Sequence, residues 1–308
     1  MLSGRFLRFF RHLNWATLRK TFLRAGQRRL TGLSAEMAYN AMLALFPAIL
    51  AILTAIGLFK SSASTFQHLA RQLSEIAPKE AIFLIKGFTE EIAQSQNQGL
   101  FSLSFVVALW TASGAVSAAM TAFDQIHQIP PEQTRPFWKA KLISLGLTIG
   151  NILLLIVACF LVFISDWIVQ MVAARSSFLQ SELLAVWRLL SWPLALGLVA
   201  SACAFIYRYG PSRWNHGTPV MPGAIVAALL WAIVSGLFRL YVSNFGNYNK
   251  VYGTVGAVIV LMLWLYMTSL VLLLGDQLNA TVGEEMHRKA NARKEALEAS
   301  EAAESEAS

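Results

Sequence analysis

Carboxylates and amides stand at the ends of long apolar segments of this chain, where they could bind a polar solute or carry protons. Glu36 and Asn40 begin the first segment, Asp124 ends the second, and Asp276 and Gln277 end the sixth. Polar groups in a bilayer cost free energy unless they face a partner or water, so they are the best pointers to function. Two hypotheses follow for this layer: a vestibule that admits substrate, or helix caps and ion pairs with residues of the loops.

A second polar layer is predicted near the opposite ends of the segments. Arg188 lies inside the fourth segment and Arg239 near the end of the fifth. Asp166, at the end of the third segment, is a candidate partner for Arg188. The alternative use of Arg188 is to hold an anionic group of a substrate.

The connection from residue 243 to residue 254 is rich in residues that tolerate turns. Its polar candidates are Asn247, Tyr248, Asn249 and Tyr252. We expect an ordered loop. It is either a turn anchored by interfacial tyrosines or a re-entrant element whose amides and carbonyls contact substrate.

Catalytic and metal-binding patterns are weak by comparison. Cys159 and Cys203 both fall inside apolar segments, without the spacing of metal ligands. No two histidines have the spacing of a hydrolytic metal site; they are His12, His68, His127, His216 and His287. The sequence therefore predicts no metal, no cofactor and no enzymatic activity.

Six apolar segments must position these side chains, and each reaches the roughly 20 residues that span a bilayer. They cover residues 37–59, 100–122, 142–165, 183–207, 220–242 and 255–279. With 56% hydrophobic and only 14% charged residues, the composition exceeds what a soluble core of this length would bury. The predicted fold is an all-α membrane protein, a six-helix transmembrane bundle formed by residues 37–282.

The basic residues predict the orientation of the bundle. Of 25 Lys and Arg residues, about 17 fall in the N-terminal segment, the C-terminal tail and alternate loops, against about 6 in the other loops. Both termini are therefore predicted to be cytoplasmic. The same asymmetry, with attraction to anionic lipids, explains the net charge of +8, so we expect membrane lipids and not nucleic acid as partners.

Three segments lie outside the predicted spans. Residues 1–36 mix arginines with aromatic residues such as Phe9 and Phe22, which favours an interfacial amphipathic helix over a disordered basic arm. Residues 60–99 carry two apolar runs at helical spacing, which predict short external helices that act as a lid or as packing. Residues 283–308 are charged, and we expect a solvated or disordered tail.

Proline and small residues add detail to the predicted spans. Pro47 and Pro193 lie inside the first and fourth segments, where each removes a helical hydrogen bond and predicts a kink. Gly223 and Ala227 form a pair of small residues four positions apart, a spacing that lets membrane helices approach closely.

Several stretches resemble the YihY/BrkB family of bacterial inner-membrane proteins, once labelled ribonuclease BN. They are Tyr207 to Pro211, Pro222 to Ala224, Asn247 to Thr254 and Gly275 to Ala280. The resemblance covers roughly residues 30–282 and implies a six-span protein of the bacterial plasma membrane. One departure is that the family's glutamate near the end of the sixth span is matched here by Gln277, with the carboxylate of Asp276 one position earlier.

These features favour transport or export of a small solute or lipid-like molecule. Two predicted kinks, two polar layers and the lack of a catalytic pattern support that reading. The alternative is a scaffold or envelope-organising protein that moves nothing. Ribonuclease activity is disfavoured, because no acid–base pair and no nucleic-acid groove are visible. The oligomeric state and the substrate stay open.

Overall fold

The computed structural model of the protein describes residues 14–58, 98–173, 180–213, 220–244 and 248–307, with side chains over shorter stretches of these. Helices account for nearly all of the described residues, and no strand occurs among them. The helices are α2 (Trp15–Gln27), α3 (Leu30–Leu58), α6 (Gln98–Ile126), a 3-10 turn η1 (Pro131–Gln133), α7 (Phe137–Ala173), α8 (Gln180–Tyr209), α9 (Met221–Asn244) and α10 (Tyr248–Ala307). The predicted all-α class is confirmed.

Within the described residues, four helices are long and apolar enough to cross a membrane. The stretches are Phe105–Ile126 of α6, Phe137–Leu154 of α7, Met221–Val242 of α9 and Val258–Ala296 of α10. A shorter apolar stretch, Pro193–Tyr209, lies in α8. The chain is therefore an all-α membrane protein. Each of the six predicted spans falls on one long helix, α3 and α8 included, while the count of six crossings stays a prediction.

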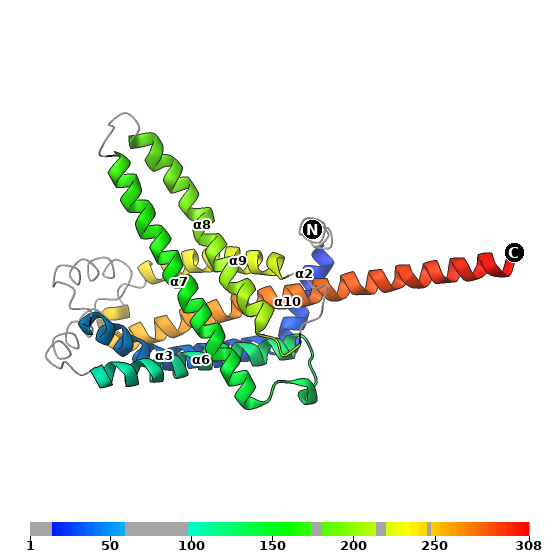
Figure 1. The fold of residues 1–308 in the computed structure, drawn as a ribbon, viewed down its shortest axis with the longest axis horizontal. Coiled ribbons are helices and arrows are strands. Elements are labelled where there is room, and N and C mark those ends of the chain that lie inside the picture. Colours follow the sequence, from blue (N-terminus) through cyan, green and yellow to red (C-terminus); the bar gives the residue numbers. More distant parts are fainter. Residues whose placement is uncertain (1–13, 59–97, 174–179, 214–219, 245–247, 308) are drawn as a thin grey trace.

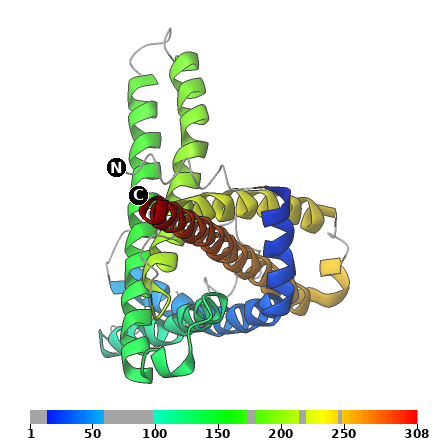
Figure 2. The same ribbon diagram turned by 90° about the vertical axis from the view of Figure 1, so that its right-hand side faces the viewer.

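α10 contacts α2, α3, α6 and α9 (Figure 1). α3, α6, α9 and α10 run side by side, whereas α7 and α8 form an antiparallel pair that crosses this group at an angle. α2 lies across one end of the group and contacts α10 (Figure 2). We call this end, where α2 lies, the α2 end of the bundle.

The best-packed part of the core lies toward the α2 end. Phe123 of α6 and Tyr207 of α8 are fully buried and meet edge to face, with ring centroids 5.7 Å apart. Leu30 and Leu273 belong to the same cluster. Large apolar side chains elsewhere on α6, α7, α9 and α10 are exposed, as the hydrocarbon of a bilayer requires.

Two boundaries differ from the sequence-based expectation. α9 ends at Asn244 and α10 begins at Tyr248, so most of the loop expected over residues 243–254 is helical, and residues 245–247 lie outside the described residues. α10 also continues to Ala307, through the tail for which we had expected solvation or disorder. That tail is helical, and its described side chains beyond His287 are exposed. Helix-forming Ala, Glu and Lys residues allow this extension without any core.

The prolines do not interrupt the helices. Pro47 lies within α3 and Pro193 within α8, and both helices continue through them. The kinks expected there stay predictions. The external connection over residues 60–97 and residues 1–13 of the basic segment lie outside the described residues. α2 and the start of α3 cover most of the remainder of that segment.

Candidate functional site

The last turns of α10 within the bundle carry a row of fully buried polar side chains. Asp276, Gln277, Asn279 and Thr281 are each 1% exposed or less. Buried polar groups are stable only when neighbouring elements satisfy them. The partners of this row come from the α2–α3 turn, from α6 and from α9, so the row organises the α2 end of the bundle.

Asn279 joins α10 to the start of α9. Its Oδ1 accepts a hydrogen bond from the Gly223 amide at 2.9 Å, and its Nδ2 donates to the Val220 carbonyl at 3.0 Å. The first amides of a helix have no partner within it, and Asn279 satisfies one of them from a different helix. The approach is close: a side chain on Gly223 would meet Asn279 at 2.4 Å, and one on Gly275 would meet Ala227 at 2.7 Å. The predicted packing role of Gly223 and Ala227 is confirmed.

Gln277 joins α10 to the turn between α2 and α3. Its Oε1 accepts a hydrogen bond from Nη1 of Arg28 at 3.0 Å, and the same nitrogen donates to the carbonyl of Ile126 at the end of α6. Nε2 of Gln277 donates to Thr281 at 3.1 Å. Burial lowers the pKa of Arg28, with the charge of Arg24 acting in the same direction. Arg28 therefore holds three elements together.

Asp276 faces His127, which directly follows α6. His127 Nε2 lies 3.1 Å from Asp276 Oδ2, while the described residues provide no well-formed hydrogen bond to either oxygen of Asp276. We therefore treat the contact as mainly ionic. Burial lowers the pKa of His127, but its interactions with Asp276 and the charge of Asp124 together outweigh that effect, and the net pKa of His127 is raised above 6.5.

Asp124 and Arg135 hold the segment that follows α8. Asp124 accepts hydrogen bonds from the Ser212 amide and hydroxyl, both at 2.6 Å. The Arg135 guanidinium donates to the carbonyls of Tyr209, Gly210 and Pro211 at 3.2, 2.8 and 2.7 Å. Burial lowers the pKa of Arg135, and the charge of Asp124 opposes that effect.

Lys141, one turn into α7, is buried although charged. It is 8% exposed, and its Nζ donates to Ser113 Oγ at 2.6 Å and to the Trp110 carbonyl at 3.1 Å. The same nitrogen lies 4.3 Å from the centroid of the Trp110 ring, a favourable cation–π distance. Every partner of Lys141 named here is neutral.

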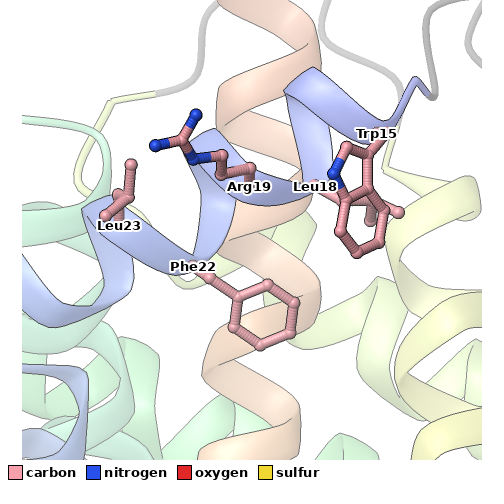
Figure 3. A pocket seen from close by; sticks show the side chains of 5 residues that line it. All are labelled: Trp15, Leu18, Arg19, Phe22 and Leu23. Atoms are coloured by element: carbon pink, nitrogen blue, oxygen red, sulfur yellow. The ribbon is translucent and has the colours of Figure 1, made fainter.

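A hollow of about 470 Å³ opens between the end of α6 and the start of α7. Charged and hydroxyl groups line it together with apolar walls. Its lining includes Asp124, Arg135, Lys141, Ser212, Met120 and Phe137. A second hollow, of about 370 Å³ and mainly apolar, lies against α2 (Figure 3).

The remaining predicted residues are dispersed over the fold. Glu36 is exposed on α3, and Asn40 donates to the Glu36 carbonyl at 2.9 Å and lies against Gly114 of α6. Arg239 is exposed near the end of α9. Of the first polar layer predicted from the sequence, only Asp124 lines the hollow. Asp276 and Gln277 are packed against neighbouring helices instead.

Several candidates fall where side chains are not described. Asn247 lies outside the described residues, and Tyr248, Asn249 and Tyr252 belong to the first turns of α10. Arg188 lies on α8, and its side chain is outside the described set, so its pairing with Asp166 stays a prediction. Among the described residues, no group of three or more His, Cys, Asp or Glu side chains is placed to hold a metal ion.

Sequence reasoning missed three contributors: Arg28, His127 and Lys141. Arg28 and His127 were grouped with the basic segment and with the dispersed histidines, and Lys141 stood one residue before a predicted span. A usable signal existed for Lys141. It stands at the start of an apolar span, and the preceding span carries Trp110 and Ser113, which can hold a lysine inside the bundle. No pattern in the sequence pairs His127 with Asp276.

Comparisons with a family model and with individual proteins point to the same family. The family described as Virulence factor BrkB matches residues 21–300. A protein of Bacillus subtilis named as ribonuclease-like, YfkH, is 34% identical over 252 residues, which cover 80% of this chain and 88% of the relative. A UPF0761 membrane protein of Photobacterium profundum is 28% identical over 263 residues, 83% of this chain and 77% of the relative.

A further relative, a UPF0761 membrane protein of Alteromonas mediterranea, is 26% identical over 260 residues, 82% of this chain and 83% of the relative. No solved structure matches the chain. The resemblance read from the motifs is confirmed over most of the sequence. Our expectation that the chain is not an enzyme stays a prediction, and the label ribonuclease-like describes YfkH. The chain belongs to the BrkB family, whose UPF0761 relatives are named as membrane proteins.

Proposed function

We propose that this membrane protein moves or exports a small lipid-like molecule. The observation that carries the proposal is the hollow between α6 and α7, which combines charged side chains with apolar walls at the ends of two membrane-length helices. An amphiphile needs both environments at one place: polar groups for its head and an apolar path for its body. The hollow has both kinds of lining.

The surface beside the hollow supports an amphiphilic ligand over a water-soluble one. Phe137, Trp138 and Leu142, at the start of α7, are 69%, 71% and 69% exposed. Such a surface belongs in lipid, so a molecule in the hollow has direct access to the bilayer. We further propose that the membrane is the bacterial plasma membrane and that the α2 end faces the cytoplasm, in keeping with the distribution of basic residues.

The test is reconstitution of the full chain into liposomes that contain a fluorescent phospholipid. Dithionite added outside bleaches only outward-facing probes, so protein-dependent movement raises the bleached fraction above that of empty liposomes. Asp124→Asn, which alters the lining, should slow this movement. Glu36→Gln, an exposed change outside the lining, should leave it unchanged. Bleaching equal to that of empty liposomes, over several lipid probes, would contradict the proposal.

A scaffold is the second candidate, and α10 favours it. This helix extends well beyond the bundle, and its described side chains from His287 onward are exposed (Figure 1). A projecting charged helix is suited to recruiting a partner. Deleting residues 290–308 should leave lipid movement unchanged if the protein is a transporter. Loss of a crosslinked partner together with absent lipid movement would favour the scaffold.

A further inference from the structure

The two cations that line the α6–α7 hollow are held by neutral groups. Arg135 donates to backbone carbonyls, and Lys141 donates to a carbonyl and to the Ser113 hydroxyl. Among the ion pairs of the described residues, none joins Arg135 or Lys141 to a carboxylate. Carbonyl dipoles orient a cation but leave its charge in place.

The one acid in the lining does not cancel this charge by direct contact. Asp124 is engaged by the amide and the hydroxyl of Ser212, both at 2.6 Å. With one carboxylate against two cations, the charged side chains of the lining sum to +1. A buried ammonium without an anion is costly at the edge of a bilayer. Lys141 is 8% exposed, so an anion in the hollow would remove part of that cost.

The depth of the hollow fits the headgroup layer. The apolar stretch of α6 ends at Ile126 and that of α7 begins at Phe137, and residues beside both ends line the hollow. Exposed Phe137 and Trp138 mark the boundary, where aromatic side chains of membrane proteins concentrate. The start of α7 adds the positive end of its helix dipole to the same place.

Building on the function proposed above, we propose that the hollow binds the phosphate of an anionic phospholipid, with Arg135 and Lys141 as the cations that attract it. The acyl chains then lie along the exposed face of α7 that carries Phe137 and Leu142. An ammonium has three N–H donors, and two of those on Lys141 have partners among the described residues. This leaves one donor for a phosphate oxygen.

Thermal melting of the full chain in neutral detergent tests the headgroup site. Phosphatidylglycerol should raise the melting temperature more than phosphatidylcholine at equal concentration, because only the first carries a net negative charge. Lys141→Gln should weaken the apparent affinity for phosphatidylglycerol by roughly tenfold, the effect of one charge-assisted hydrogen bond. Lys139→Gln is the matched control, since Lys139 is exposed on the same turn of α7.

Equal stabilisation by the two lipids would overturn the proposal, as would equal affinity of native protein and Lys141→Gln. Inorganic phosphate that abolishes the effect of phosphatidylglycerol at low millimolar concentration would assign the site to a free phosphate compound and overturn the lipid. If Lys141→Gln does not fold, native mass spectrometry of the native protein decides, through retention of phosphatidylglycerol over phosphatidylcholine. Binding without lipid movement in liposomes would leave this site standing and contradict only the transport function.

Discussion

At the residue scale, Asn279 illustrates how a buried amide can act as a helix cap from a distance. It supplies both an acceptor to Gly223 and a donor to Val220, so the start of α9 is fixed to α10 by one side chain. A short side chain at Gly275 or Gly223 is excluded because the two backbones nearly touch. The glycines set the spacing of the helices and Asn279 sets their register.

We predict that Asn279→Ala destabilises the protein strongly. The Gly223 amide would remain buried without a partner, which costs about 1–3 kcal/mol, whereas the Val220 carbonyl would keep its hydrogen bond from the Ala224 amide. Asn279→Asp retains an acceptor but loses the donor, so it should destabilise the protein less than Asn279→Ala does. The melting temperature in detergent measures both, with the exposed Asn291→Ala as control. An Asn279→Ala protein with the same melting temperature as the native protein would contradict the capping role.

The pair formed by half-buried His127 and buried Asp276 predicts a dependence of stability on pH. The pKa of His127 is raised in the folded protein above its unfolded value of 6.5, so the protonated form is favoured by folding. Its contribution is therefore fully present below pH 6.5 and is lost as pH rises through the raised folded pKa. The other charged groups that act on His127 are Arg28, which lowers its pKa, and Asp124, which raises it.

The measurement is the melting temperature of native protein and His127→Gln between pH 5 and pH 9. The stability advantage of the native protein should be greatest below pH 6.5 and should shrink as pH rises. His287→Gln, at an exposed position on α10, is the matched control and should follow the native profile. A constant difference between native and His127→Gln across this range would show that the pair contributes no linked proton.

At the element scale, apolar runs predicted where the helices lie but not where all of them end. The span expected over residues 255–279 is the middle of α10, which begins at Tyr248 and ends at Ala307. Hydropathy reports the part of a helix that meets lipid, and it is silent on polar turns that continue the same helix into water. The polar row of α10 was visible in the sequence. Its partners were not, because His127 and Arg28 lie about 150 and 250 positions away along the chain.

For α2, the composition predicted an amphipathic helix but not the face that packs against α10. Thr17, Thr21 and Ala25 are buried at a spacing of four residues, while Trp15 and Phe22 are 82% and 65% exposed. Two ion pairs tie the helix to α10: Arg24 with Glu284 at 2.6 Å and Lys20 with Glu285 at 3.9 Å. The exposed rings suit an interfacial helix that α10 holds in place.

We predict that Phe22 lies in lipid and Arg19 in water. In Figure 3 the ring of Phe22 points to the side of α2 where ribbons of the bundle lie, and Arg19 points to the other side. An environment-sensitive fluorophore on Phe22→Cys should therefore emit at shorter wavelength in nanodiscs than the same probe on Arg19→Cys. Cys159 and Cys203 are replaced by alanine in both proteins. If the probe emits at both positions at the long wavelength typical of water, α2 lies away from the interface.

At the scale of the whole molecule, four helices are long and apolar enough to cross a membrane when only the described residues are considered, whereas the sequence predicts six crossings. The two arrangements agree on the termini, because an even number of crossings returns the chain to the same side. They disagree on the α6–α7 connection. With six crossings, residues 127–136 lie on the same side as both termini. If α3 and α8 do not cross, the same residues lie on the opposite side.

We predict that the six-crossing arrangement is correct, with both termini and residues 127–136 in the cytoplasm. Arg135, Lys139 and Lys141 lie at this connection, and positive charges near span ends are retained on the cytoplasmic side. Alkaline phosphatase fused after residue 134 should therefore be inactive and a green fluorescent protein there should be bright. The phosphatase fused within residues 60–97 should be active. A phosphatase active after residue 134 and inactive within 60–97 would establish four crossings, and would place the α6–α7 hollow and its cations on the outer face of the membrane.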